Sequence, residues 1–441
     1  MTRRDKAPGP KLPIDIRRYR VDAADLMLEL HRRYGDIVRF RVGPQLVHQI
    51  AAPELIGRIL HDRDSFRRGK VYRGFELFLG QGMLTADGEN WRVRRRAGQP
   101  HFRAGRLATA TSGLAAAVRD LLTRWEGYAA EGRPVDLVPE VMRLTFDAVG
   151  RALFDFAPDG RAEQVVALGP AVLSAMFPGS PEQLLPPWLP TPVRRRLRTA
   201  QTIFDEAAED LLARHAAQPS PDGLIGDLFA ARRADTGAPL TRPQVAEELR
   251  TYLWTGYETT GCGLAWALWE IARHPAVQDR LRAELDTVLS GRTPDAADLP
   301  RLRYLRQVLD ETLRLHPPIP SFPREPVRPM EIGGYRIPAG STVFLGSQVV
   351  QRDPRYWPDP DTFDPGRFAP DRPKPLPYTY FPFGGGPRRC IGAPLAELEL
   401  MVAVAMIAQR FRLATDPERL VREHFLISLR PRPGVLLTLR E

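Results

Sequence analysis

Residues 381–399, FPFGGGPRRCIGAPLAELE, decide the fold of this chain, because they set one cysteine between a glycine-rich loop and an apolar helix. The three glycines at 384–386 can adopt backbone angles closed to other residues, so amide N–H groups can approach Cys390. Arg388 and Arg389 add positive charge, and the pattern from Leu395 onward predicts a helix. Amide donors, arginines and a helix N-terminus all stabilise a thiolate, which is a nucleophile or a metal ligand.

The alternative is a buried structural thiol, which is the commonest state of a cysteine. The spacing favours the ligand, because the stretch resembles, position for position, the haem-binding signature of the cytochrome P450 family. The matching residues are Phe383, Gly386, Arg388, Cys390 and Gly392, followed by Ala396 and Glu399. The resemblance implies a bound haem b whose iron is ligated by Cys390, and a thiolate ligand favours cleavage of the O–O bond.

The chain has 441 residues and shows no linker or internal repeat. We therefore expect one domain over residues 1–441, with an irregular N-terminal arm over residues 1–20. The resemblance implies a mainly helical P450 fold with a small β region. In that fold the haem lies between a long central helix and the cysteine loop.

Charge and cysteine content limit the partners. The formal net charge is +10, but no basic run is interleaved with aromatic residues, so we expect no nucleic-acid partner. Two cysteines are too few for a disulfide framework, which favours a cytoplasmic location. The sequence contains no run of about 18 apolar residues, so we expect no membrane span. The arginine-rich, lysine-poor composition is typical of a GC-rich bacterial genome. We also expect a monomer.

A second motif lies at residues 91–102, WRVRRRAGQPHF. Trp91 and Arg95 match the family's WxxxR element and, four residues apart, share one helix face, so together they are expected to bind one haem propionate. Arg92, Arg94 and Arg96 would then face solvent. The alternative for the whole run is a solvated basic face.

A long helix is predicted from Thr241, as N-cap, to Arg273, spanning about 50 Å. Its centre, TGYETTGCG, contains three glycines, each costing a helix about 1 kcal/mol, which indicates function or close approach of another group. The segment resembles the family's oxygen-activation motif. The resemblance implies that Thr259 and Glu258 deliver protons and that Gly256 leaves room for dioxygen.

Two alternatives stay open in this helix. Thr259 could instead donate its hydroxyl proton to a carbonyl of its own helix, as helical threonines commonly do. Thr255 stands where the family usually has a smaller apolar residue, and its hydroxyl could alter the water network or contact substrate. Cys262 is interpreted as a core residue.

The pair Glu311 and Arg314 faces one way at a spacing of three residues. With Arg367 it resembles the family's Glu–Arg–Arg network, which implies a buried cluster that fixes the cysteine loop. Arg324 and Arg388 match two further arginines that bind haem propionates.

Further elements are predicted at residues 22–33 (helix), 37–41 and 46–50 (hairpin), 53–61 (helix), 64–90 (irregular), 105–235 (successive helices broken at 186–192), 331–343 (two strands and a Gly-Gly turn), and 426–429 with 434–439 (hairpin).

The implied reaction is insertion of one oxygen atom from O₂ into a C–H or C=C bond of a hydrophobic secondary metabolite such as a terpenoid, polyketide or modified peptide. The alternative, kept open by Thr255, is oxidative coupling or ring closure without oxygen insertion. A haem-binding sensor is a third hypothesis. We expect electrons from an acidic ferredoxin and its reductase, docking on Arg92, Arg94, Arg96 and Arg389.

The substrate pocket is predicted by analogy from apolar and aromatic residues, with residues 169–185 as its roof. Several of these residues could equally belong to the core, and Trp254 could either narrow the cavity or stack on a ligand. The candidates are Phe75, Phe78, Leu79, Met176, Phe177, Trp254, Thr255, Ile319, Phe322 and Ile427.

Overall fold

The computed structural model describes residues 6–156, 160–177, 180, 182, 185–186, 188–220 and 223–440. The chain divides into two compact units. Unit one comprises Met1–Arg73, Glu311–Cys390 and Arg422–Arg432, and unit two comprises Gly74–Asp310, Ile391–Val421 and Pro433–Glu441. The expectation of a single domain stays a prediction, because compactness alone does not show whether either unit folds by itself.

Unit one is built on a five-stranded sheet of order β1-β2-β8-β5-β3. The predicted hairpin forms its edge: β1 (Ile37–Val42) and β2 (Gln45–Ile50) are antiparallel, with Ile37 opposite Ile50. β2 pairs in parallel with β8 (Thr342–Leu345), whose four residues are all buried. Strands buried on both faces read as continuous apolar runs.

Unit one contains these further elements: α1 (Ile16–Val21), α2 (Ala23–Tyr34), α3 (Pro53–His61), β3 (Phe66–Arg67), η1 (Lys70–Tyr72), β5 (Phe322–Pro326), β6 (Met330–Ile332), β7 (Tyr335–Ile337), α15 (Ser347–Gln351), η4 (Pro365–Phe368), η5 (Gly386–Arg388), β10 (Arg422–Phe425) and β11 (Leu429–Arg432).

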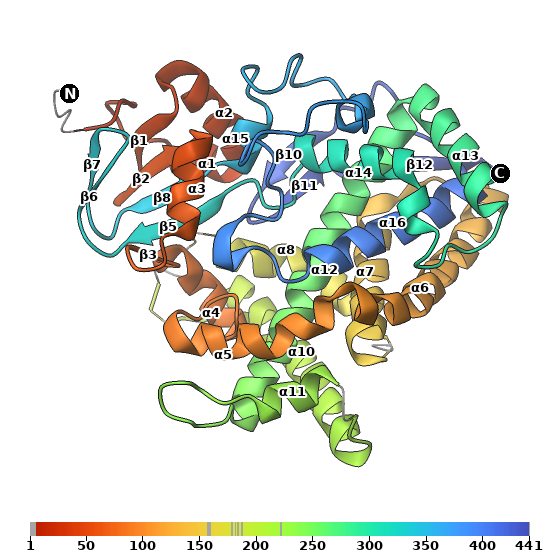
Figure 1. Cartoon of the computed structure of the whole chain (residues 1–441), viewed down its shortest axis with the longest axis horizontal. Helices are drawn as coiled ribbons and strands as arrows, with labels where there is room; N and C mark the ends of the chain where they lie inside the picture. The colour runs from red at the N-terminus through yellow and green to blue at the C-terminus, as the bar shows by residue number, and fades with distance from the viewer. Residues whose placement is uncertain are drawn as a thin grey trace. The chain divides into compact units, whose positions relative to one another are not determined.

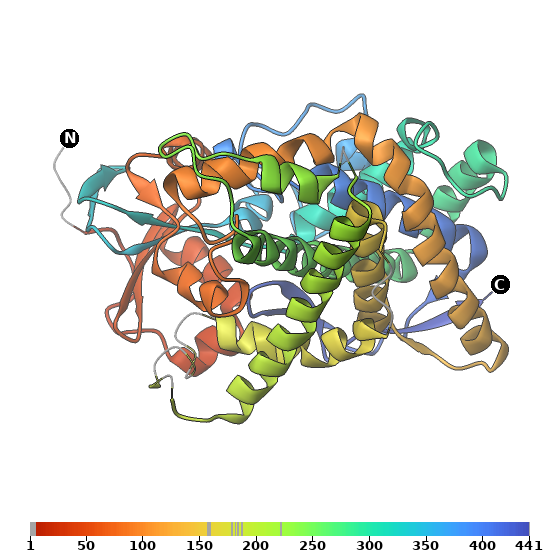
Figure 2. The ribbon, with the colours of Figure 1, turned by 90° about the horizontal axis from the view of Figure 1, so that it is seen from below.

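Unit two is organised around α12 (Arg242–Arg273), which begins at the predicted N-cap. The Thr241 side chain accepts from the Gln244 amide and the Gln244 side chain accepts from the Thr241 amide, a complete capping box. Most of the helix is buried, and α7 (Leu137–Phe154) packs against it. Figures 1 and 2 show α10 (Pro192–Ala217) crossing α12 within this unit.

Unit two contains these further elements: α4 (Arg73–Leu79), α5 (Gly88–Gly98), η2 (Gln99–Phe102), α6 (Ala104–Ala130), β4 (Val135–Asp136), α8 (Arg161–Met176), α11 (Leu224–Ala230), α13 (Pro275–Leu289), η3 (Leu299–Arg301), α14 (Arg303–Leu315, whose last turn belongs to unit one), α16 (Ala393–Arg410), β9 (Arg412–Ala414) and β12 (Leu436–Arg440).

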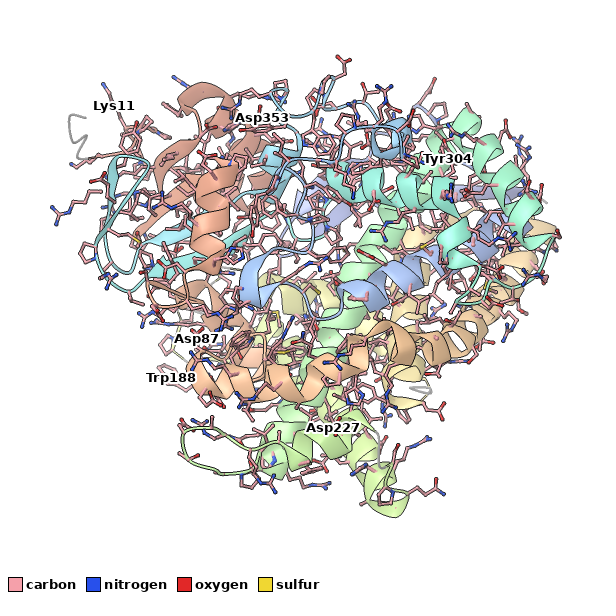
Figure 3. All side chains as sticks on the ribbon, in the orientation of Figure 1. Lys11, Asp87, Trp188, Asp227, Tyr304 and Asp353 are labelled. Atoms are coloured by element: carbon pink, nitrogen blue, oxygen red, sulfur yellow. The ribbon has the colours of Figure 1, made fainter. Side chains whose placement is uncertain are left out.

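The helix at residues 53–61 and the long helix to Arg273 are confirmed, and the break before Pro192 separates α8 from α10. Trp188, labelled in Figure 3, lies in that break and is 78% exposed. The prediction that residues 1–20 are irregular is wrong at their C-terminal end, because α1 begins at Ile16. Residues 1–5 lie outside the described residues. In the predicted roof, residues 178–179, 181 and 183–184 also lie outside them.

Two other predictions are wrong. Residues 64–90 are not irregular throughout, because they contain β3, η1 and α4 and reach into α5. The C-terminal hairpin has different partners: β10 pairs with β11, whereas β12 pairs with β9 and with β4, far away in the sequence. In the part of the chain that the structure describes, no helix has the length and apolar character needed to cross a bilayer.

Candidate functional site

The cysteine loop of unit one is a bend fixed by two left-handed glycines. Gly384 and Gly386 have φ of 68° and 62°, and a Cβ on Gly386 would overlap the Leu60 carbonyl. The Cys390 amide donates to the Phe383 carbonyl at 3.0 Å, which closes the bend. Cys390 itself is exposed, so its side chain points out of the loop and not into the protein core.

Gln351 ties this loop to the end of α14. Its side-chain oxygen accepts from the Phe381 amide at 2.9 Å, and its side-chain nitrogen donates to the carbonyls of Leu313 and Arg314, both at 3.0 Å. Gln351 is fully buried, so each of these bonds is protected from water. The sequence alone assigned no structural role to Gln351.

The predicted buried network is present in unit one. Arg314 donates to both carboxylate oxygens of Glu311, at 2.7 and 2.8 Å, and neither side chain is exposed. The Arg367 guanidinium lies 3.3 Å from the same carboxylate. Arg314 also donates to the carbonyls of Gln351, Pro360 and Thr362.

The network joins α14 to the segment that leads to the cysteine loop. Burial raises the pKa of Glu311, and hydrogen bonds from Arg314 oppose that rise. The carbonyl acceptors on Arg314 and the paired carboxylate together satisfy a charge that would be very unfavourable if buried alone. The loop is therefore held by a cluster in which the loss of one charged side chain leaves another charge buried without a partner.

Two further predicted residues also lie in unit one. Arg324 is on β5, is 7% exposed, and donates to the Pro323 carbonyl at 2.8 Å. Arg388 ends the short helix η5, two residues before Cys390. Gly392, predicted on the same motif, is the N-cap of α16 in unit two.

In unit two, α5 carries Trp91 and Arg95 one turn apart, with the indole buried and the guanidinium half-buried. The prediction that Arg94 faces solvent is wrong. Arg94 is 0% exposed, and its Nε lies 3.2 Å from Oε2 of Glu248 on α12. The buried face of α5 includes positions 91, 94 and 98, spaced by three and four residues, so Arg94 points inward.

Glu248 joins three segments of unit two. Besides pairing with Arg94, it accepts the Met83 amide at 2.8 Å, so it links α12 to α5 and to the segment before α5. Burial raises the pKa of Glu248 to about 7, although the charge of Arg94 opposes that rise. No sequence motif indicated this pair.

Gly256 faces α7 and not an open cavity. A Cβ at this position would lie 2.6 Å from Cγ2 of Val149, and one on Gly261 would lie 2.7 Å from the Met142 sulfur. Both glycines therefore let α12 and α7 approach closely, which was the alternative explanation for glycine in this helix. This contact favours the close-approach explanation for Gly256, and its role in leaving room for dioxygen stays a prediction.

Replacement of Gly256 by alanine is expected to destabilise the protein by about 1–3 kcal/mol, because the added methyl group overpacks the interface between the two helices. Thermal unfolding of the single variant and of the double variant Gly256→Ala/Val149→Ala checks this. The second change should restore part of the loss. A single variant of unchanged stability but impaired oxygen consumption would instead support the dioxygen role.

The two threonines of the α12 motif bond to their own helix. The Thr255 hydroxyl donates to the Thr251 carbonyl at 2.7 Å, and the Thr259 hydroxyl donates to the Thr255 carbonyl at 2.9 Å. A hydroxyl has one proton and two acceptor lone pairs, so both threonines can still accept from water. To donate elsewhere, Thr259 must first rotate away from that carbonyl.

Glu258 is 3% exposed, and the Cys262 sulfur lies 3.8 Å from its Oε1, one helical turn away. Cys262 is fully buried, which confirms its assignment to the core. The carboxyl group of Glu258 is therefore buried within unit two, on α12.

Several pocket candidates of unit two form an aromatic cluster. Phe78 lies 4.9 Å from Trp254 and 5.4 Å from Phe204, centroid to centroid, and Trp254 lies 5.3 Å from Tyr257. Phe78, Leu79, Met176, Phe177 and Trp254 are all buried, whereas Phe75 and Thr255 are partly exposed. The rings of Phe78 and Trp254 therefore pack against other aromatic side chains, and their contact with a substrate stays a prediction.

The candidates of unit one are partly exposed: Ile319, Phe322 and Ile427. The Phe322 ring packs on the cysteine loop, 6.0 Å from the Phe381 ring and against Gly384. Ile427 lies between β10 and β11. Their contact with a substrate stays a prediction.

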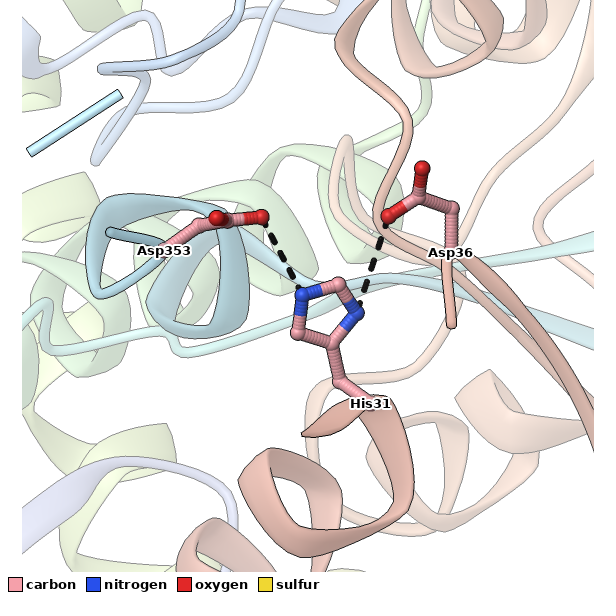
Figure 4. A group of neighbouring side chains, drawn as sticks. All are labelled: His31, Asp36 and Asp353. Carbon is pink, nitrogen blue, oxygen red and sulfur yellow. Dashed lines mark hydrogen bonds and ion pairs between the residues drawn. The ribbon is translucent and has the colours of Figure 1, made fainter. Parts of the chain in front are cut away.

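One other cluster in unit one has the donor types of a metal site. His31 lies between two carboxylates, 3.1 Å from Asp353 and 3.8 Å from Asp36 (Figure 4). Arg355 donates to both carboxylates, with its Nη2 2.6 Å from Asp353. The negative charges already have a cationic partner, so we assign no metal to this group.

Comparison with known proteins identifies the class. The model of the cytochrome P450 family matches residues 16–438, so the chain belongs to that family. It is a P450 monooxygenase, an oxidoreductase, as the names of its relatives also indicate.

Three curated relatives cover most of the chain. Cyclooctatin synthase of Streptomyces melanosporofaciens is 35% identical, covering 92% of this chain and 87% of its own. Cyclooctat-9-en-7-ol 5-monooxygenase of the same organism is 32% identical, covering 87% and 84%. Pentalenene oxygenase of Streptomyces avermitilis is 30% identical, covering 88% and 86%.

Two solved structures confirm the fold. A cytochrome P450 (CYP102L1) superposes with a TM-score of 0.86 at 26% identity, covering 100% of both chains. The retinoic acid bound cyanobacterial CYP120A1 superposes with a TM-score of 0.87 at 24% identity, covering 99% of both. The predicted fold class is confirmed.

Family and fold imply a haem whose iron is ligated by a cysteine. The residues present fit that group. Cys390 is exposed on a rigid bend, whereas the other cysteine is buried in α12. Unit one carries arginines on β5 and η5 and unit two carries arginines on α5, and guanidinium groups are suited to the carboxylates of a haem.

Proposed function

We propose that Cys390 is the iron ligand and that four side chains bind the haem carboxylates. The Phe383 carbonyl orients the Cys390 amide, and Gly392 starts the helix that follows the ligand. The carboxylate-binding residues are Trp91, Arg95, Arg324 and Arg388. The single observation that carries this proposal is the exposed Cys390 on a loop held by the buried Glu311 network.

A cysteine-ligated haem, when bound, supplies the iron at which O₂ is activated for transfer of one oxygen atom. The chain supplies the protons. Glu258 holds a carboxyl in a buried layer next to Thr259, whose hydroxyl oxygen can accept from a water while its proton bonds the Thr255 carbonyl. Rotation of that hydroxyl turns it into a donor, so we infer a relay from Glu258 through water to Thr259.

The substrate we infer is a terpenoid. Three relatives at 30–35% identity are named cyclooctatin synthase, cyclooctat-9-en-7-ol 5-monooxygenase and pentalenene oxygenase. The similarity spans 87–92% of this chain. Oxidative coupling has weaker support than it had from the sequence, because the Thr255 hydroxyl is engaged with its own helix.

The test is a substrate screen followed by isotope labelling. Cyclic terpenoid hydrocarbons and alcohols are expected to shift the haem spectrum from low to high spin, whereas aromatic polyketides and cyclic peptides of similar size are not. Turnover of the best ligand under ¹⁸O₂ should place one labelled oxygen in the product. An unlabelled product would establish coupling, and a shift confined to polyketides or peptides would reject the substrate class.

We further propose that an acidic ferredoxin and its reductase supply electrons. The predicted docking surface must be revised, because Arg94 is buried. Replacing Arg94 by glutamate would place two carboxylates together in the core and would not test docking. Arg92 and Arg96 are about half exposed, and both pair with Glu89. Arg389 is also exposed.

The double change Arg92→Glu/Arg96→Glu is expected to slow the first electron transfer about three- to tenfold at low ionic strength, with the difference shrinking as salt is added. Stopped-flow reduction by a surrogate ferredoxin measures it. Arg242→Glu is the matched control, since Arg242 is also about half exposed and paired with a glutamate, Glu209. Equal slowing in both variants would remove the docking role.

A further inference from the structure

Tyr252 carries a buried polar atom that the proposed mechanism does not use. It lies on α12, is 4% exposed, and its hydroxyl has no hydrogen-bond partner among the described residues. Leaving a buried donor unsatisfied costs about 1–3 kcal/mol, so such a group in a native fold calls for an explanation.

The surroundings of Tyr252 form a ladder between α5 and α12. Arg94 on α5 pairs with Glu248 on α12, and one turn further along each helix Gly98 meets Tyr252. A Cβ on Gly98 would overlap the Tyr252 hydroxyl oxygen, so only glycine lets the phenol take this position. The Tyr252 ring stacks on Phe102, with centroids 5.9 Å apart and planes 30° apart.

This position is next to the haem-binding residues of unit two. The Cβ site on Gly98 is also 3.4 Å from Cδ1 of Ile391, the residue that directly follows Cys390 in the chain. Gly98 lies three residues after Arg95, on the same helix. The hydroxyl thus lies where α5, α12 and the residue after the cysteine meet.

The charges around the phenol favour a hydrogen-bond donor. Burial raises the pKa of Tyr252 well above its ordinary value, Glu248 adds to the rise, and Arg95 and Arg94 oppose it. The phenol therefore keeps its proton throughout the physiological range. A donor within the field of two guanidinium groups is suited to an anionic acceptor.

We propose that the Tyr252 hydroxyl donates a hydrogen bond to the haem carboxylate that Arg95 binds, which makes Tyr252 a further cofactor-binding residue. The inference rests on the proposed role of Arg95, and it does not depend on the substrate. The burial that makes the phenol a poor acid also makes this hydrogen bond strong, because no water competes for it.

The test measures haem loss from the holoenzyme to excess apomyoglobin. Tyr252→Phe removes one oxygen atom and keeps the ring, and it is expected to speed haem transfer about ten- to a hundredfold, the loss of one hydrogen bond to a charged group. Tyr257→Phe is the control, since Tyr257 is fully buried on the same helix but packs in the aromatic cluster. Equal rates for the two variants would overturn the proposal.

Gly98→Ala provides an independent arm, because its methyl group would displace the hydroxyl. It should speed haem transfer in the wild-type background and have a much smaller effect in the Tyr252→Phe background, and additive effects would contradict the proposal. Arg95→Ala separates the two roles. Faster haem loss in Arg95→Ala with an unchanged rate in Tyr252→Phe would reject the role of Tyr252 and keep that of Arg95. Unchanged haem loss in both variants would reject both roles.

Discussion

Replacement of Cys390 by serine is expected to abolish the red-shifted absorption band that carbon monoxide gives with the reduced enzyme, and to bring turnover below detection. A serine hydroxyl is not ionised near neutral pH and does not donate electron density as a thiolate does, so the iron loses the ligand that favours O–O cleavage. The change is nearly isosteric, so the fold of the chain should be unaffected.

Cys262→Ser is the matched control. Cys262 is fully buried on α12, beside Glu258, so its replacement should leave the carbon monoxide band in place. Far-ultraviolet circular dichroism and thermal unfolding of both variants show whether either change disturbs folding. A normal band in Cys390→Ser would remove the assignment of the ligand.

The second large effect is expected at Glu311. Glu311→Gln leaves the buried Arg314 and the partly exposed Arg367 without a carboxylate partner, and breaking the buried Glu311–Arg314 pair in this way costs about 3–5 kcal/mol. We expect a lower urea midpoint by circular dichroism and a reduced haem content after purification, because the same cluster holds the segment that leads to the cysteine loop.

An exposed ion pair of the same unit gives the comparison. Arg18 and Glu29 pair on the surface, both about half exposed, and Arg18→Ala should cost at most about 1 kcal/mol with full haem content. If Glu311→Gln were as stable as Arg18→Ala, the buried network would have no part in holding the loop.

Motif spacing predicted the local structure well. The Thr241 cap, the helix predicted from Leu395 and the pairing of Glu311 with Arg314 all follow from residues close together in sequence, where geometry is fixed by the helix or turn itself. The family resemblance added Arg367, which no local pattern places near Glu311.

Predictions about which way a side chain points were less successful. Arg94 was assigned to solvent because Trp91 and Arg95 were placed together on the haem-binding face, but helical periodicity also puts Arg94 on the buried face with Trp91, where it meets Glu248. Gly256 was assigned to the oxygen site alone, and the structure adds that its missing side chain lets α7 pack closely against α12. In both cases the deciding contact comes from another helix, which the sequence around the residue does not contain.

Long-range strand pairing could not be predicted for a similar reason. The strand at Leu436–Arg440 alternates in a way that fits any partner, and it pairs with residues 135–136 and 412–414 and not with its neighbour in sequence. Short strands carry too few side chains to specify a partner by pattern alone.

The aromatic cluster of α4, α10 and α12 bears on laboratory evolution of this enzyme. Trp254 is the obvious position to randomise when a broader product range is wanted, yet its ring packs edge-on against Phe78, Phe204 and Tyr257. Shrinking it to alanine would leave a cavity costing about 3–5 kcal/mol. Libraries would keep more folded members if they varied the partly exposed Phe75, Ile319 and Ile427 first.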